Sequence, residues 1–260
     1  MPEGYRPKYP VQTLEKAIDI LLYLKKNASP NGVGIAEISE NLNMGKSSVH
    51  RILDTLYAYG FVEHMRQGTG YCLGWGLYDV AQSVLNNHRL SETNYREYVM
   101  DICDEFFETV NLGICNNGEV VIICKIEPDR RLRSRVEVGE REPLYCTALG
   151  KQFLASFSEE ELEKYLSHAP FEKLTEQTLT TDEEIKAELK KVEVQGFSID
   201  YMEFNEDLIC IAAPVRDFTK KVVAAISVSL PENRYTEEKG KKIIQTLKEK
   251  TDELSGFLGY

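Results

Sequence analysis

The sequence predicts an α+β protein in two parts: an N-terminal winged helix-turn-helix and, after a linker helix, a larger domain of helices and strands. Three observations support this class. Residues 13–59 show helical periodicity broken by tight turns. Residues 61–74 read as a short hairpin. Beyond about residue 91, amphipathic helices alternate with β-rich runs such as "LICIAAPVR" and "VVAAISVSL".

The elements of the first part follow from its apolar spacing and its breakers. Three prolines in residues 1–10 indicate a flexible arm, and Gly60 ends the second helix of the pair. The turn "NMG" is expected to place Gly45 at positive φ. In order, we expect an arm (1–10), a winged helix-turn-helix (11–74) with helices at 13–25, 35–42 and 46–59 and a hairpin at 61–74, and a linker helix (75–90).

The second part, residues 91–260, is expected to be a single α+β domain. Asn116-Asn117-Gly118 marks the turn of its first hairpin. The predicted helices lie at 95–110, 147–157, 159–166, 182–196 and 236–258, and the predicted strands lie within 111–128 and at 131–139, 197–204, 208–216 and 222–230.

Charge divides at the same place as the predicted domains. The whole chain has 260 residues and a formal net charge of −11. Residues 1–90 hold 9 Lys and Arg against 8 Asp and Glu, whereas residues 91–260 hold 22 against 34. Such asymmetry indicates separate tasks for the two parts. The near-neutral first part does not by itself establish nucleic-acid binding.

Composition argues against several other classes. No stretch approaches the roughly 18 apolar residues of a membrane span, and "MPEGYRPKYP" lacks the apolar core of a signal peptide. We therefore expect a cytoplasmic protein with no membrane partner. The six cysteines are scattered without a CxxC pair, which indicates reduced thiols. These spacings give no support to a zinc site, and we assign neither a metal nor a cofactor.

The segment "NMGKSSVHRILDTLYAYG" (43–60) carries the clearest functional signal. Its apolar residues form one buried stripe, and the opposite side of its first turns is rich in hydrogen-bond donors. These donors are Lys46, Ser47, Ser48, His50 and Arg51. The second helix of a helix-turn-helix enters the major groove with its N-terminal residues facing base edges. There an arginine can bond guanine bidentately, and serines can bond phosphates.

Other interpretations of this segment remain open. A solvated helix face capped by Ser47 would carry the same residues, and His50 is as compatible with a bystander as with a contact. The order of helix, turn, helix and wing favours DNA. Arg66 and Gln67, at the hairpin tip, would then touch the backbone or the minor groove. A winged helix that binds protein instead would lack the salt dependence of phosphate binding.

Together, these motifs resemble the IclR family of bacterial transcriptional regulators. The resemblance runs from about Gln12 to Leu258 and includes "GIAEISENLNMGKSSVHRILDTLYAYGFV", "GTGYCLG", "REPLYCTALGKQFLA", "GFSIDYMEFNEDLICIAAPV" and "VVAAISVSLP". It implies a GAF-like effector-binding domain after the linker helix. It also implies a homodimer or a dimer of dimers that binds double-stranded operator DNA as a repressor of a catabolic operon.

The resemblance also implies a site for a small-molecule effector. The matching positions are Ala148, Leu149, Asp200, Cys210, Ser227 and Ser229. Strand alternation puts the two serines on one side of their strand, although they could also face solvent. We expect a small carboxylate or sugar acid, with its acid end at the helix start and its hydroxyl end at Asp200. Leu149 limits the space available.

Two further alternatives concern catalysis and assembly. An enzyme would need Cys210 as nucleophile and a nearby base, and the second part contains only His168. We therefore expect no enzymatic activity. The apolar stripe of the linker helix, which comprises Leu77, Val80, Ala81, Val84 and Leu85, predicts a dimer. The same stripe could instead pack against its own winged helix.

Overall fold

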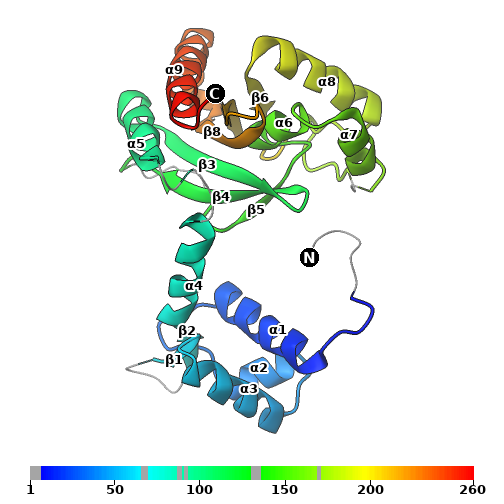
Figure 1. Cartoon of the computed structure of the whole chain (residues 1–260), viewed down its shortest axis with the longest axis vertical. Coiled ribbons are helices and arrows are strands. Elements are labelled where there is room, and N and C mark those ends of the chain that lie inside the picture. The colour runs from blue at the N-terminus through cyan, green and yellow to red at the C-terminus, as the bar shows by residue number, and fades with distance from the viewer. Residues whose placement is uncertain (1–6, 66–69, 87–89, 91–92, 130–135, 169–170) are drawn as a thin grey trace. The chain divides into compact units, whose positions relative to one another are not determined.

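The computed structural model describes residues 7–65, 70–86, 90, 93–129, 136–168 and 171–260. Contacts divide the chain into a smaller unit, within Tyr5–Ser91, and a larger unit that begins at Glu92 (Figure 1). Each unit has its own apolar core. Among the described residues, no helix is both long and apolar enough to cross a membrane.

The smaller unit is a winged helix-turn-helix, as the sequence predicts. Its helices pack around buried residues such as Ile20, Ile38 and Leu53. A two-stranded antiparallel wing pairs Glu63 with Cys72. The elements are α1 (Gln12–Lys26), α2 (Ile35–Asn41), α3 (Lys46–Ala58), β1 (Val62–His64), β2 (Tyr71–Leu73) and α4 (Trp75–Asn86). The predicted tip residues Arg66 and Gln67 lie outside the described residues, as does most of the predicted arm.

Two details of the turn before α3 correct the sequence-based interpretation. Asn43 has the positive φ, at 50°, whereas Gly45 is extended at φ −63° and ψ 135°. Asn tolerates the left-handed region well among non-glycine residues, so the turn does not require a glycine for this conformation. Gly45 is the N-cap of α3, with no side-chain cap bond. The cap at Ser47, which belonged to the alternative interpretation of a solvated helix face, does not form, because Ser47 already lies inside the helix.

The larger unit is built on an antiparallel sheet. In the described residues its strands follow the order β5-β4-β3-β8-β7-β6. They are β3 (Thr109–Asn116), β4 (Glu119–Ile126), β5 (Arg141–Pro143), β6 (Ser198–Tyr201), β7 (Leu208–Arg216) and β8 (Val222–Pro231). The buried patterns of β7 and β8 match the predicted apolar runs.

Helices cover both faces of this sheet (Figure 1). One face carries α5 (Tyr95–Phe106) and α9 (Glu237–Phe257), which contact β3 and β7 respectively. The other face carries α6 (Ala148–Leu154), with α7 (Glu159–Leu166) and α8 (Asp182–Gln195) beyond it. α6 contacts β6, β7 and β8, and its first residues, Ala148 and Leu149, lie close to polar residues of those strands.

Local backbone geometry explains which predicted elements of the larger unit agree with the structure and which do not. Asn117 and Gly118 form the predicted two-residue turn, with φ of 56° and 78°. The predicted helix at 95–110 is too long, because Phe107 takes a left-handed conformation and β3 begins at Thr109. The strand predicted at 131–139 is wrong in its described part, residues 136–139, which lead into a turn at Gly139. The strand found there is β5, and residues 131–135 lie outside the described part.

Candidate functional site

The first turns of α3 carry an exposed group of hydrogen-bond donors. The side chains of Lys46, Ser47, Ser48, His50 and Arg51 are all exposed, whereas Val49, Ile52 and Leu53 are buried. In the described part of the chain, none of these five donor side chains makes a hydrogen bond or ion pair. The structure therefore brings the five predicted residues to one end of α3 with their polar groups unused.

The larger unit contains a small cavity between α6 and the sheet. Its volume is about 20 Å³, which is room for about one water molecule. All six residues predicted for the effector site line it: Ala148, Leu149, Asp200, Cys210, Ser227 and Ser229. They come from four elements, namely the start of α6 and the strands β6, β7 and β8.

Strand register explains why these residues meet. Asp200 of β6 pairs with Cys210 of β7, and Cys210 pairs with Ser229 of β8. Ser227 pairs across to Asn111 of β3. Cross-strand partners point to the same face of a sheet, so these side chains share the face that α6 covers. Both serines are buried, and an exposed position on the sheet, the alternative interpretation, is excluded.

Hydrogen bonds orient the polar side chains around Ser229 in this cavity. Asn111 Nδ2 donates to Ser229 Oγ at 3.3 Å, and Cys210 Sγ donates to the same oxygen at 3.2 Å. Because Ser229 Oγ accepts both bonds, its own hydroxyl hydrogen is left for another acceptor.

The start of α6 is fixed by close packing and by a cap. Thr147 Oγ1 accepts from Gly150 N at 3.1 Å and donates to Pro143 O at 2.7 Å. A Cβ on Gly150 would lie 2.3 Å from the backbone of Leu144, so only glycine fits there. Ala148 and Leu149 are thereby held, buried, at the edge of the cavity.

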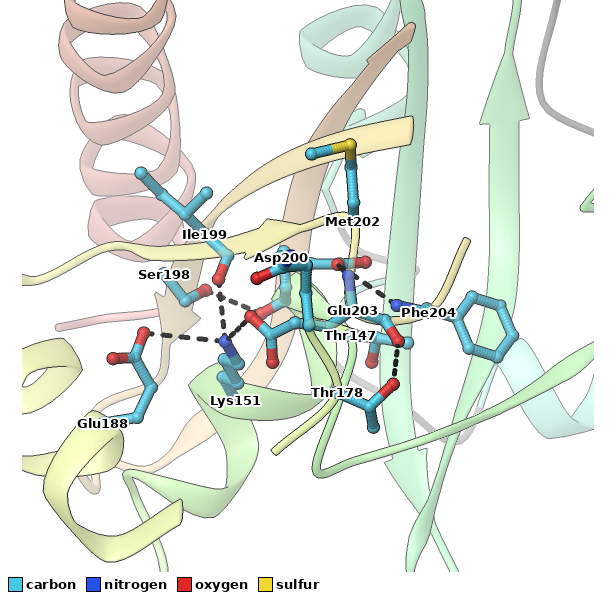
Figure 2. A network of polar contacts seen from close by, with 12 residues as sticks. Thr147, Lys151, Thr178, Glu188, Ser198, Ile199, Asp200, Met202, Glu203 and Phe204 are labelled. Atoms are coloured by element: carbon cyan, nitrogen blue, oxygen red, sulfur yellow. Dashed lines mark hydrogen bonds and ion pairs between the residues drawn. The ribbon is translucent and has the colours of Figure 1, made fainter. Parts of the chain in front are cut away.

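Asp200 is held by a polar network that continues away from the cavity (Figure 2). Asp200 Oδ1 accepts from Glu203 N at 2.7 Å and from Phe204 N at 3.3 Å. Lys151 Nζ bonds the Glu203 carboxylate and donates to Ile199 O at 2.8 Å. Lys151 is 1% exposed and also lies 3.5 Å from Glu188 Oε1 of α8.

Two threonines in the segment before α8 hold the backbone at residues 202 and 203. Thr178 Oγ1 donates to Glu203 O at 2.6 Å (Figure 2). Thr175 Oγ1 donates to Met202 O at 2.7 Å. The network thus connects α6, β6, α8 and the 171–180 segment around one side of the cavity.

Burial changes the titration of the cavity's acidic groups. Desolvation, reinforced by the nearby Glu203, raises the pKa of Asp200 to about 7 despite its two backbone hydrogen bonds. Desolvation and Glu140 raise the pKa of Glu142, another lining residue, to about 7. The pKa of the Cys210 thiol is raised well above its usual value by burial and by Asp200. A thiol of this kind is a poor nucleophile.

Sequence reasoning missed about half of the cavity lining. The additional residues are Asn111, Val136, Glu142, Thr147, Phe204, Asn205 and Leu208. A polar Asn111 inside the apolar run "TVNLGIC" was a usable signal, because buried strands seldom carry an amide without a reason. Glu142 gave no signal, since "EREP" is typical of an exposed segment. Among the described residues, no group of three His, Cys, Asp or Glu side chains is placed to hold a metal ion.

A winged helix-turn-helix joined to an α+β domain with an internal cavity is the architecture of a transcriptional regulator. Residues 13–65 match the IclR helix-turn-helix domain, and residues 82–256 match the C-terminal domain of bacterial IclR transcriptional regulators. The chain therefore belongs to the IclR family.

Individual relatives agree with this assignment. The transcriptional regulator KdgR of Escherichia coli is 32% identical over 231 residues, which cover 88% of this chain and 86% of KdgR. The transcriptional repressor AllR of Escherichia coli is 30% identical over 256 residues, covering 95% and 90%. The crystal structure of Thermotoga maritima IclR has a TM-score of 0.82 at 32% identity, covering 96% and 99%. These relatives are regulators and not enzymes, as the sequence predicts.

Proposed function

We propose that this regulator represses a catabolic operon, binds its operator through α3 and releases it when a small acid enters the cavity of the larger unit. Its site of action is the cytoplasm, where operator DNA lies. The exposed donor group of α3 is the observation that carries the DNA-binding part. Five donors at one helix end, unused within the described protein, match what phosphates and purine edges accept.

The N-terminus of α3 adds to this argument. No side chain caps it, and although Ser48 N donates to Gly45 O at 2.9 Å, the N–H groups of Lys46 and Ser47 and the helix dipole remain available to a phosphate. Within this proposal, Arg51 reads a base edge, Lys46, Ser47 and Ser48 hold the backbone, and His50 adds a contact at the groove. Arg66 and Gln67 of the wing are assigned to the DNA backbone or the minor groove.

Assembly as a homodimer or a dimer of dimers is supported by apolar surface on the smaller unit. Along α1, Leu14, Ile18 and Leu22 are 59%, 46% and 59% exposed. On α4, Trp75 and Val80 are 71% and 56% exposed, and no described residue of this helix is buried. Apolar surface of this extent favours a protein interface, and two-fold symmetry would match an inverted repeat in the operator.

The effector is proposed to be a small carboxylate or a sugar acid. The serine hydroxyls can donate or accept, which suits both a carboxylate and hydroxyl groups. The proposed orientation keeps the acid end near Ala148 and Leu149 and a hydroxyl near Asp200. Because the cavity holds only about one water molecule, binding requires side chains such as Leu149 to move.

A binding experiment tests the regulatory proposal. Purified protein should bind a fragment from upstream of its neighbouring catabolic genes, with an affinity that falls steeply with salt concentration. A thermal-shift screen of small acids should find ligands that raise the melting temperature and weaken DNA binding. Failure to bind DNA at low salt would overturn the proposal, as would ligands that stabilise the protein but leave operator affinity unchanged.

A further inference from the structure

One wall of the cavity carries acceptor atoms that the protein leaves unpaired. Asn111 is 4% exposed, and its Oδ1 has no hydrogen-bond partner in the described structure. Its amide nitrogen is already committed to Ser229 Oγ. An unpaired buried amide oxygen costs free energy comparable to a lost hydrogen bond, so this oxygen is available to accept a hydrogen bond from a ligand or a water molecule in the cavity.

Glu142 provides a second set of acceptor atoms in the same cavity. It lies on β5, opposite Val120 of β4, and is 9% exposed. Within the described part of the chain, its carboxylate makes no hydrogen bond and no ion pair. An unpaired carboxyl group at this depth is costly for the fold, whereas an apolar side chain would pack there without that cost.

The charge of the lining narrows what this wall can bind. The ionisable acids of the lining are Glu142 and Asp200, and the described lining contains no lysine or arginine. Lys151 lies close behind the cavity but is committed to Glu203 and Ile199 O. Acceptor groups therefore outnumber fixed positive charges, so a ligand must bring its own hydrogen-bond donors.

We propose that Asn111 and Glu142 form an acceptor subsite for hydroxyl groups, which selects polyhydroxylated acids over unsubstituted acids of the same length. The subsite rests on the proposed effector function of the cavity. A hydroxyl fits better than an ammonium group because it donates to an ionised carboxylate and accepts from a protonated carboxyl group. Burial raises the pKa of Glu142 to about 7, so both forms are present near neutral pH.

Calorimetry with acids matched in chain length tests the subsite. The probes are hexanoate, 6-aminohexanoate and D-gluconate, with propionate, lactate and glycerate as a shorter series. In the wild type, the most hydroxylated member of a series should bind at least tenfold more tightly than the unsubstituted member. A site built to bond a hydroxyl discriminates strongly against an analogue that lacks it.

Variants of Glu142 test whether its carboxylate causes the preference for hydroxylated acids. Glu142→Leu should remove most of the preference for hydroxylated acids, and Glu142→Gln, which keeps one acceptor oxygen, should retain part of it. Glu206→Leu is the matched control, because Glu206 is exposed and does not line the cavity. This control should bind like the wild type. Circular dichroism spectra and melting curves would show whether each variant folds.

The outcomes separate the two proposals. Equal affinity for hydroxylated and unsubstituted acids would overturn the acceptor subsite while leaving effector binding intact. Tighter binding of 6-aminohexanoate than of D-gluconate would also overturn it, in favour of an ammonium subsite. An unchanged hydroxyl preference in Glu142→Leu would remove Glu142 from the subsite. If no acid binds, both the subsite and the proposed effector class fail.

Discussion

The helices of the two units begin in different ways. In the smaller unit, the N-caps of α1, α2 and α3 are Val11, Gly34 and Gly45, and none makes a side-chain cap bond. In the larger unit, α6, α7, α8 and α9 begin at Thr147, Ser158, Thr181 and Thr236, each of which accepts from a backbone N–H. Among the described α-helices of the larger unit, α5 is the exception, because its N-cap Asn94 makes no side-chain cap bond. The other four satisfy an N-terminal N–H group internally, whereas α1, α2 and α3 of the smaller unit do not.

Polar groups without partners also differ in their location between the two units. On α3, five donors and an uncapped helix end face outward, which is expected of a surface that meets an anionic partner. In the larger unit, most of the described buried polar groups are paired, but Asn111 Oδ1 and the Glu142 carboxylate at the cavity are not. Polar groups without partners therefore occur at both candidate sites, on the surface of the smaller unit and inside the cavity of the larger unit.

The largest expected effect comes from breaking the paired interior. Lys151→Met removes the partner of a buried carboxylate, Glu203, and should destabilise the larger unit by about 3–5 kcal/mol. Lys191 also pairs with Glu188, but its side chain is 69% exposed. Lys191→Met should therefore cost less than about 1 kcal/mol. Urea denaturation followed by circular dichroism measures both, and equal losses would contradict the distinction between buried and exposed pairs.

The next effect concerns the open face of α3. Arg51→Ala should leave the fold intact, since the side chain is exposed and unpaired in the described structure. It should weaken operator binding by roughly 1–3 kcal/mol, with the loss concentrated at one base pair. Fluorescence anisotropy with the operator and its single-base variants, at matched salt, measures this. Operator affinity equal to that of the wild type would rule out base contact by Arg51.

The stability of the larger unit should depend on the protonation of Glu142. The folded pKa of Glu142 is raised to about 7, so the folded state holds its proton after the unfolded state has released it. This group therefore costs stability progressively as pH rises from about 4.5 to about 7. Glu142→Gln avoids that cost. Its stability relative to the wild type should rise by roughly 1–2 kcal/mol between pH 5.5 and pH 8. A difference that stays constant across this range would contradict an unpaired buried carboxyl group.

The smallest expected effect comes from adding a side-chain cap to the N-terminus of α3. A Cβ at Gly45 would meet nothing within 4 Å, and its φ of −63° suits any residue. Gly45→Ser should cap α3 and stabilise the smaller unit by a few tenths of a kcal/mol. The new cap would occupy an N–H group proposed for a phosphate, so operator affinity should fall. A variant that gains stability and binds DNA as tightly as the wild type would argue against a role for the helix end.

The fold could be predicted from the sequence because hydrophobic periodicity and turn residues are local signals. Periodicity gave α7, β7 and β8 to within a residue, and the Asn117-Gly118 turn followed from its residue types. Failures occurred where packing decides, as at Phe107, where the helix ends early, and at β5, whose three residues pair with β4. The donors of α3 were found because they lie on one helix.

The cavity depended on contacts that no local pattern contains. The six residues assigned from the family resemblance do line it, and strand register explains their convergence. Asn111 and Glu142 were missed because what distinguishes them is a buried polar group without a hydrogen-bond partner. Only the folded structure shows that a polar group is buried without a partner.

The most direct test of the central claim is operator binding by fluorescence anisotropy, with and without the tightest-binding acid from the calorimetric panel. The wild type should lose at least fivefold in operator affinity when saturated with the acid, as expected for coupled sites. Arg51→Ala should bind the acid normally but the operator weakly, and Ser229→Ala should bind the operator normally but lose the response to the acid. Operator affinity of the wild type that is unchanged at saturating acid would contradict release of the operator by an effector in the cavity.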